Sequence, residues 1–113
     1  MDSKKISQVN ELIKRELGAI FNRELEVPDG FLITILKVEV SNNLREAKVW
    51  VSIFPFTQAE KVFAELVKKI KYLRHLLGKR LKRLNPLPQI NLILDQTEEK
   101  VDDLRQIFDE IRD

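Results

Sequence analysis

The chain contains no cysteine and a single histidine, and these two shortages exclude several kinds of chemistry. Without cysteine there is no disulfide, no thiolate nucleophile and no zinc site of the kind that requires sulfur ligands. The lone imidazole of His75 offers neither a histidine cluster for a metal ion nor a second imidazole for a proton relay. Carboxylates are plentiful, but none is paired in the sequence with a histidine, a nucleophile or an anion site. We therefore expect no catalytic residue and no metal site.

Glycine and long apolar runs are also scarce. The three glycines, Gly18, Gly30 and Gly78, lie too far apart to form a loop that cradles the phosphates of a nucleotide cofactor. No apolar run approaches the roughly 20 residues of a transmembrane helix. The first ten residues, MDSKKISQVN, lack the apolar stretch of a signal peptide. We expect a cytoplasmic protein that binds no cofactor and no membrane, with a monomer as the default state.

The charge that is present is distributed unevenly along the chain. Its 113 residues are typical of one domain, predicted to span 1–113, and 34% of them are charged with a net charge of only +2. Residues 61–83 hold nine basic residues and one acidic residue, a net charge of +8. Residues 95–113 hold three basic and eight acidic residues, a net charge of −5. A basic segment this dense attracts a polyanion such as a nucleic acid, whereas the acidic tail repels one.

Hydrophobic periodicity predicts an α+β fold with one three-stranded sheet covered by helices. A helix is predicted over residues 4–26 with Ser3 as its cap, and strands are predicted over 31–40, 46–54 and 89–94. A long helix is predicted from a cap at Thr57 to residue 84, and an amphipathic acidic helix is predicted over 98–113. Within the second strand, alternation places alanine, valine and isoleucine on one side and Trp50 and Phe54 on the other.

The long helix is predicted to have two contrasting faces. Its apolar positions recur at spacings of four, four, three, four, four and three from Val62 to Leu84. Basic residues fall on the opposite side and could follow a phosphate backbone, with Tyr72 available to stack on bases. The candidate RNA-binding residues are Lys61, Lys68, Lys69, Lys71, Tyr72, Arg74, His75, Lys79, Arg80, Lys82 and Arg83, with Lys14 and Arg15 of the first helix extending the patch. A second hypothesis is a protein-interaction module that uses Trp50 and Phe54.

Four blocks of sequence, in order, resemble the ribosome-binding factor A family. Residues 8–17 (QVNELIKREL) are similar to the first helix of the family with its I-x-R-E-L ending. Residues 37–52 (KVEVSNNLREAKVWVS) resemble its VEVSxDLxxAxVYVS block, and residues 73–81 (LRHLLGKRL) resemble IRxxLGxxL. Residues 88–97 (PQINLILDQT) are similar to P-x-L-x-F-x-x-D-x-S. The resemblance runs from about residue 4 to residue 108.

This resemblance implies a type II KH-like domain, ordered α-β-β-α-(α)-β, that is not an enzyme. It implies a partner, the small ribosomal subunit and its rRNA, whose late processing and folding the family assists, and it implies a role in supporting growth in the cold. It also implies that an assembly GTPase and initiation factor three act in the release of the protein. The sequence departs from the family at residues 69–71 (KIK), where the family has an Ala-x-Gly kink. It departs again at Val101, where family members often have glycine.

Overall fold

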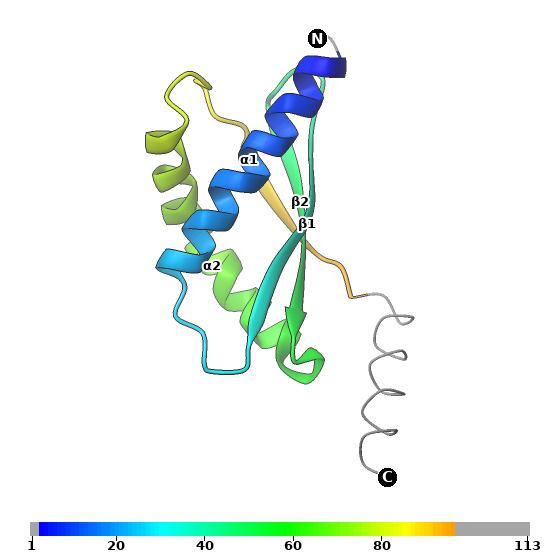
Figure 1. Ribbon diagram of the computed structural model, residues 1–113, viewed down its shortest axis with the longest axis vertical. Helices are drawn as coiled ribbons and strands as arrows, with labels where there is room; N and C mark the ends of the chain where they lie inside the picture. Colours follow the sequence, from blue (N-terminus) through cyan, green and yellow to red (C-terminus); the bar gives the residue numbers. More distant parts are fainter. Residues whose placement is uncertain (1–2, 97–113) are drawn as a thin grey trace.

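The computed structural model describes residues 3–96 and has the α+β architecture that the sequence predicts (Figure 1). The elements follow in the order α1 (Ser3–Glu24), β1 (Leu32–Val40), β2 (Glu46–Phe54), the short 3-10 helix η1 (Phe56–Gln58), α2 (Ala59–Arg80) and β3 (Gln89–Leu94). This arrangement is consistent with a KH-like fold. The helix predicted over 98–113 lies outside the described residues.

The three strands form one mixed sheet in the order β1-β2-β3. β1 and β2 are antiparallel, and the turn between them is closed by Asn43, whose Oδ1 accepts a hydrogen bond of 3.0 Å from the backbone N–H of Arg45. β3 pairs with β2 in parallel, with Trp50 opposite Ile93. Because parallel neighbours cannot be joined by a tight turn, the chain crosses over through α2 before β3 begins.

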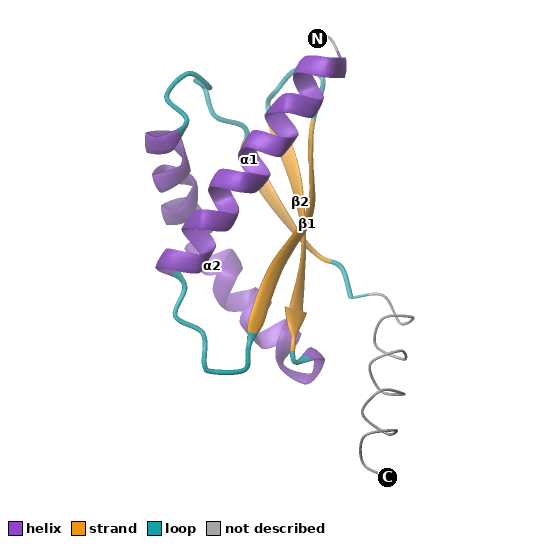
Figure 2. Ribbon diagram, viewed as in Figure 1, coloured by secondary structure: helices purple, strands orange, loops and turns teal. Residues whose placement is uncertain are grey.

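Both helices pack on the same face of the sheet, where they enclose the core (Figure 2). The alternation predicted for β2 is confirmed, since Ala47, Val49, Val51 and Ile53 are all fully buried. They are joined by apolar residues of the helices and the other strands: Ile13, Leu17, Ile20, Phe21, Val38, Val40, Leu66, Leu73, Leu77, Leu81 and Ile90. The edge of β1 that does not pair with β2 is partly covered by α1. There the backbone N–H of Val40 donates a hydrogen bond of 2.8 Å to Oδ1 of Asn10. Such closure limits pairing with other chains at an exposed strand edge.

The long helix differs from its prediction at both ends. Thr57 does not cap it, because that residue lies within η1 and α2 begins at Ala59 without a side-chain cap. α2 ends at Arg80 rather than at residue 84, since Leu81 leaves helical geometry with φ −114° and ψ 57°. The apolar spacing continues past the helix end because Leu81 remains buried in the core while the chain turns toward β3. At the first helix, Ser3 already belongs to α1.

The middle of α2 is continuous. Residues 69–71, where the family pattern has its Ala-x-Gly interruption, are helical, and α2 runs as one element of 22 residues. The unbroken apolar spacing of the sequence indicates this continuity, because every turn contributes a side chain to the same buried face. The basic residues before and after position 70 therefore lie on one helix.

Candidate nucleic-acid interface

α2 separates apolar and cationic side chains onto opposite faces, as its sequence predicts. Leu66, Leu73 and Leu77 are at most 2% exposed and fix the helix against the sheet. Four residues at helical spacing on the opposite side are exposed, namely Lys68, Lys71, His75 and Lys79. We call these four the cationic face. Because the buried leucines fix the rotation of the helix, the cationic face is presented to solvent as one stripe.

A hollow of about 480 Å³ lies at the C-terminal end of this face. It is lined by basic side chains of α2 and the following turn, by one helical glycine and by the loop that leads to β3: Arg74, His75, Gly78, Lys79, Lys82, Asn85, Pro86 and Leu87. A Cβ atom built on Gly78 would have no heavy atom within 4 Å, so this glycine opens the hollow rather than relieving a clash. The hollow combines positive charge with a concave surface, which suits an anionic ligand.

The loop that walls this hollow is held by Arg74. Its Nε donates a hydrogen bond of 2.9 Å to the carbonyl oxygen of Pro88, and its Nη2 donates to that of Leu87. Both bonds are partly buried, so this guanidinium supports the loop as well as adding charge to the hollow. The loop residues and Gly78 were not among the candidates from sequence. Two sequence features were available for finding them, a glycine near the basic residues of the helix and the Pro-rich segment 85–88. The Pro-rich segment, however, indicated only that the helix ends there.

Arg80 is also engaged within the protein. Its Nε lies 2.6 Å from Oε2 of Glu16, which joins the end of α2 to α1. The hydrogen bond from Arg80 holds the pKa of the Glu16 carboxyl below its ordinary value, against the opposing effect of desolvation. Nζ of Lys68 lies 3.3 Å from Oε1 of Glu65 on the same helix, an exposed pair that a ligand phosphate can replace at little cost.

The other candidate residues of α2 and of the turn after it lie outside the cationic face, and several of them line other hollows. Lys61 and Lys69 line a separate hollow of about 260 Å³ beside the α1–β1 connection. Tyr72 is 55% exposed on α2. Two more, Lys82 and Arg83, lie in the turn after α2 and line a hollow shared with α1.

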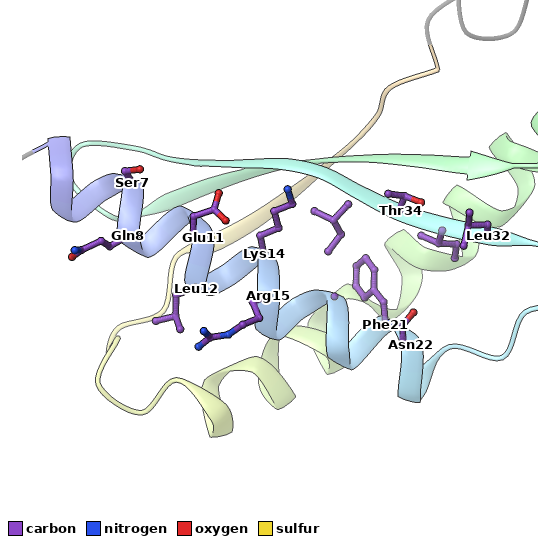
Figure 3. Close-up of a pocket in the computed structure, with 13 residues that line it drawn as sticks. Ser7, Gln8, Glu11, Leu12, Lys14, Arg15, Phe21, Asn22, Leu32 and Thr34 are labelled. Carbon is purple, nitrogen blue, oxygen red and sulfur yellow. The ribbon is translucent and has the colours of Figure 1, made fainter. Parts of the chain in front are cut away.

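Lys14 and Arg15 are not adjacent to the same hollow. They line a groove of about 980 Å³ between α1 and β1, and no residue of α2 lines this groove. Figure 3 shows Lys14 extending toward β1 and Arg15 turned away from it. Arg15 also forms an ion pair of 3.4 Å with Glu16. The structure thus groups these two cations with the α1–β1 groove rather than with the basic hollow.

Within residues 3–96, no group of three or more metal-ligating side chains occurs. Neither helix in that range is long and apolar enough to cross a membrane. The cationic face of α2 is therefore the candidate site that the described residues support best.

Comparison with known proteins identifies the family of this chain. The family model for ribosome-binding factor A matches residues 5–108. This chain belongs to the ribosome-binding factor A family. Ribosome-binding factor A of Brevibacillus brevis is 38% identical over 112 residues, covering 98% of this chain and 92% of that protein. The protein of the same name from Gloeobacter violaceus is 33% identical, covering 99% of this chain and 89% of that protein.

Membership in the ribosome-binding factor A family confirms the resemblance seen in the sequence. The matched range contains all of β1, β2, α2 and β3, so the cationic face belongs to the shared domain rather than to an addition. The protein of Akkermansia muciniphila, also named ribosome-binding factor A, is 29% identical over 96% of this chain. The exposed stripe on α2 carries positive charge, the sign that attracts a phosphate backbone.

Proposed function

We propose that this protein binds small-subunit rRNA through the cationic face of α2 and the adjoining hollow, and thereby assists late processing and folding of that rRNA. The observation that carries the proposal is the exposed stripe of Lys68, Lys71, His75 and Lys79, fixed in orientation by the leucines beneath it. The protein acts by binding an rRNA conformation and not by catalysis.

The physical basis of the affinity is the release of counterions. Lysine side chains along one helix face replace cations condensed on the phosphate backbone, which makes the affinity fall steeply as salt increases. Such contacts position the protein without reading a base sequence. Tyr72 and His75 lie on or beside the stripe, where their rings can stack on unpaired bases. Recognition therefore depends on the shape of the RNA and on its exposed single-stranded bases.

The family suggests the setting in which this binding occurs. A bacterial-type assembly factor works in the cytoplasm, supports growth in the cold, and is released with the help of an assembly GTPase. The partner is then the immature small subunit, to which the protein binds as a monomer. A site made mostly of unpaired surface cations suits a factor that is later released from the small subunit. Contacts with phosphate are screened by salt and dissociate more readily than a buried apolar interface.

A second candidate function is a protein-interaction module. It is favoured by the aromatic side chains on the far side of the sheet, where Trp50 is half-buried and Phe54 packs edge-on against Phe56 with ring centroids 5.8 Å apart. Docking through these rings would depend little on salt. Six phosphate contacts would give a slope of about −5 in a plot of log affinity against log salt concentration, by transfer of the duplex DNA coefficient. The salt dependence of binding separates the two functions.

The experiment is a comparison of two variants that have the same net charge. The first reverses Lys68, Lys71, Lys79 and Lys82 to glutamate. The control reverses four cations that are exposed elsewhere: Lys5, Arg23, Arg45 and Lys48. Both variants should retain a free energy of unfolding within about 1 kcal/mol of wild type, because exposed charges contribute little. Filter binding to a 3′-terminal fragment of small-subunit rRNA should be abolished only in the first variant. Equal loss in both would mean that net charge, rather than this face, provides the affinity.

A further inference from the structure

The groove between α1 and β1 lies beside a strand edge that is closed at one end and open at the other. β1 is an edge strand, because the sheet order is β1-β2-β3. Near the C-terminal end of β1, the backbone N–H of Val40 is already bound by Oδ1 of Asn10. Near its N-terminal end, residues 32–35 line the groove of about 980 Å³ (Figure 3). An unpaired strand edge can accept a further strand there.

The hydrogen bonds of β2 show which backbone groups of β1 point outward. The N–H of Ile53 donates to Oε1 of Gln96 at 2.6 Å, and the carbonyl oxygen of Val51 accepts a bond of 2.9 Å from the N–H of the residue after β3. Both groups therefore point toward β3 and away from β1. Register places Ile33 opposite Ile53. It places Ile35 opposite Val51. In an antiparallel ladder, neither pair then exchanges backbone hydrogen bonds, so the N–H and C=O groups of Ile33 and Ile35 point to the free edge.

The lining of the groove suits an extended peptide better than an RNA strand. Its positive charge is offset, since Glu11 also lines the groove and Arg15 is paired with Glu16 at 3.4 Å. Phe21 points from α1 toward β1 and gives the groove an apolar wall (Figure 3). Lys14 extends toward β1 and has no ion-pair partner within residues 3–96. A peptide backbone matches the groups of the free edge, whereas a lining of so little net charge attracts a polyanion weakly.

We propose that this groove binds an extended segment of a partner protein, which adds to the free edge of β1 as a fourth strand. The segment pairs with the N–H and C=O groups of Ile33 and Ile35 at the usual strand spacing of about 4.8 Å. It carries apolar side chains that face Phe21 and a carboxylate that pairs with Lys14. The site goes beyond rRNA binding and does not depend on it. No residue of α2 lines the groove, so the protein can bind the segment and rRNA at the same time.

Selection from random peptides displayed on phage tests the site, with the full chain as the bait. Gly18→Leu fills the groove, because Gly18 lines it and a Cβ atom there would meet no heavy atom within 4 Å. The control is Gly78→Leu, a matched change at the other helical glycine with open space around it. Peptides enriched on wild type should bind Gly78→Leu equally well and Gly18→Leu on the order of 10-fold more weakly, because the leucine occupies the space of the added strand. Failure to enrich any peptide, or equal binding to all three proteins, would refute the proposal.

Amide hydrogen exchange on wild type locates the bound peptide without relying on a variant. In the free protein, the amides of Ile33 and Ile35 should exchange faster than that of Thr34, which points toward β2. An enriched peptide should slow exchange at Ile33 and Ile35 on the order of 10-fold or more and leave Thr34 nearly unchanged. The same peptide with its β1-facing amide nitrogens methylated should have no effect, because it lacks the donors for the ladder. Slowed exchange elsewhere, without slowing at Ile33 and Ile35, would overturn the proposal.

Two further arms of this measurement test other occupants of the groove. A single-stranded RNA oligonucleotide should leave the exchange of Ile33 and Ile35 unchanged, and so should a higher concentration of the protein alone. Slowing by the RNA would make the groove a nucleic-acid site, and slowing with concentration would show a second copy of the chain on the edge. Either result would overturn the assignment of the groove to a partner peptide.

Discussion

The two helical glycines give a prediction in which stability and binding separate. Gly78 lies in the last turns of α2 and Gly18 lies within α1, and an added Cβ would meet no heavy atom within 4 Å at either position. Glycine in a helix is less favourable than alanine by about 0.5–1 kcal/mol. Both Gly78→Ala and Gly18→Ala should therefore stabilise the protein by about that amount. For a domain of this size the gain corresponds to an increase in Tm of about 2–8 °C.

Their effects on rRNA binding should differ. The methyl group at position 78 would project into the hollow beside the cationic face, whereas position 18 lines the groove between α1 and β1. Gly78→Ala should weaken binding of an rRNA fragment, and Gly18→Ala should not. Thermal unfolding by circular dichroism and filter binding at fixed salt measure the two effects. Unchanged affinity in a stabilised Gly78→Ala variant would refute the assignment of the hollow to the RNA site.

Two further predictions concern residues that tie the site to the rest of the fold. Arg74→Lys retains a positive charge but cannot donate to two carbonyl groups in the same way, so it should lower the free energy of unfolding by about 1–3 kcal/mol in urea denaturation. Because the same loop walls the hollow, rRNA affinity should fall together with stability, and a loss of affinity without a loss of stability would contradict the role of Arg74 in holding the loop. The second prediction follows from the lowered pKa of Glu16, which means that its ionised form stabilises the folded state above the unfolded value of 4.5. Glu16→Gln should be less stable than wild type at neutral pH, and the difference should shrink as pH falls through the lowered folded pKa; a difference that persists in acid would contradict the role of the Arg80 pair.

Most of the fold could be predicted from local patterns. The second and third strands have the bounds that were predicted, because alternation and flanking turn residues define them locally. The end of α2 could not be predicted from spacing, since Leu81 stays in the core after the helix has ended. Apolar periodicity reports which residues face the core, and it does not report the backbone conformation that brings them there.

The candidate site could be predicted only in part for a similar reason. Helical spacing places Lys68, Lys71 and Lys79 together because they share one helix, whatever the rest of the fold does. The structural roles of Arg74 and Arg80 depend on partners that are distant in the sequence. Arg74 binds a backbone carbonyl of the loop before β3, and Arg80 binds a carboxylate of α1. From the number of charges alone, all of these residues were predicted to bind RNA. The structure shows which cations have partners within the protein.

Co-sedimentation with ribosomal particles tests the central claim most directly. Wild type and the variant with Lys68, Lys71, Lys79 and Lys82 reversed would be centrifuged with purified small subunits, and separately with complete ribosomes, at low and moderate salt. The proposed function predicts that wild type sediments with free small subunits in a salt-sensitive way, is absent from complete ribosomes, and loses this binding in the variant. Sedimentation of the variant with small subunits at the wild-type level would contradict the claim that the cationic face of α2 binds the rRNA.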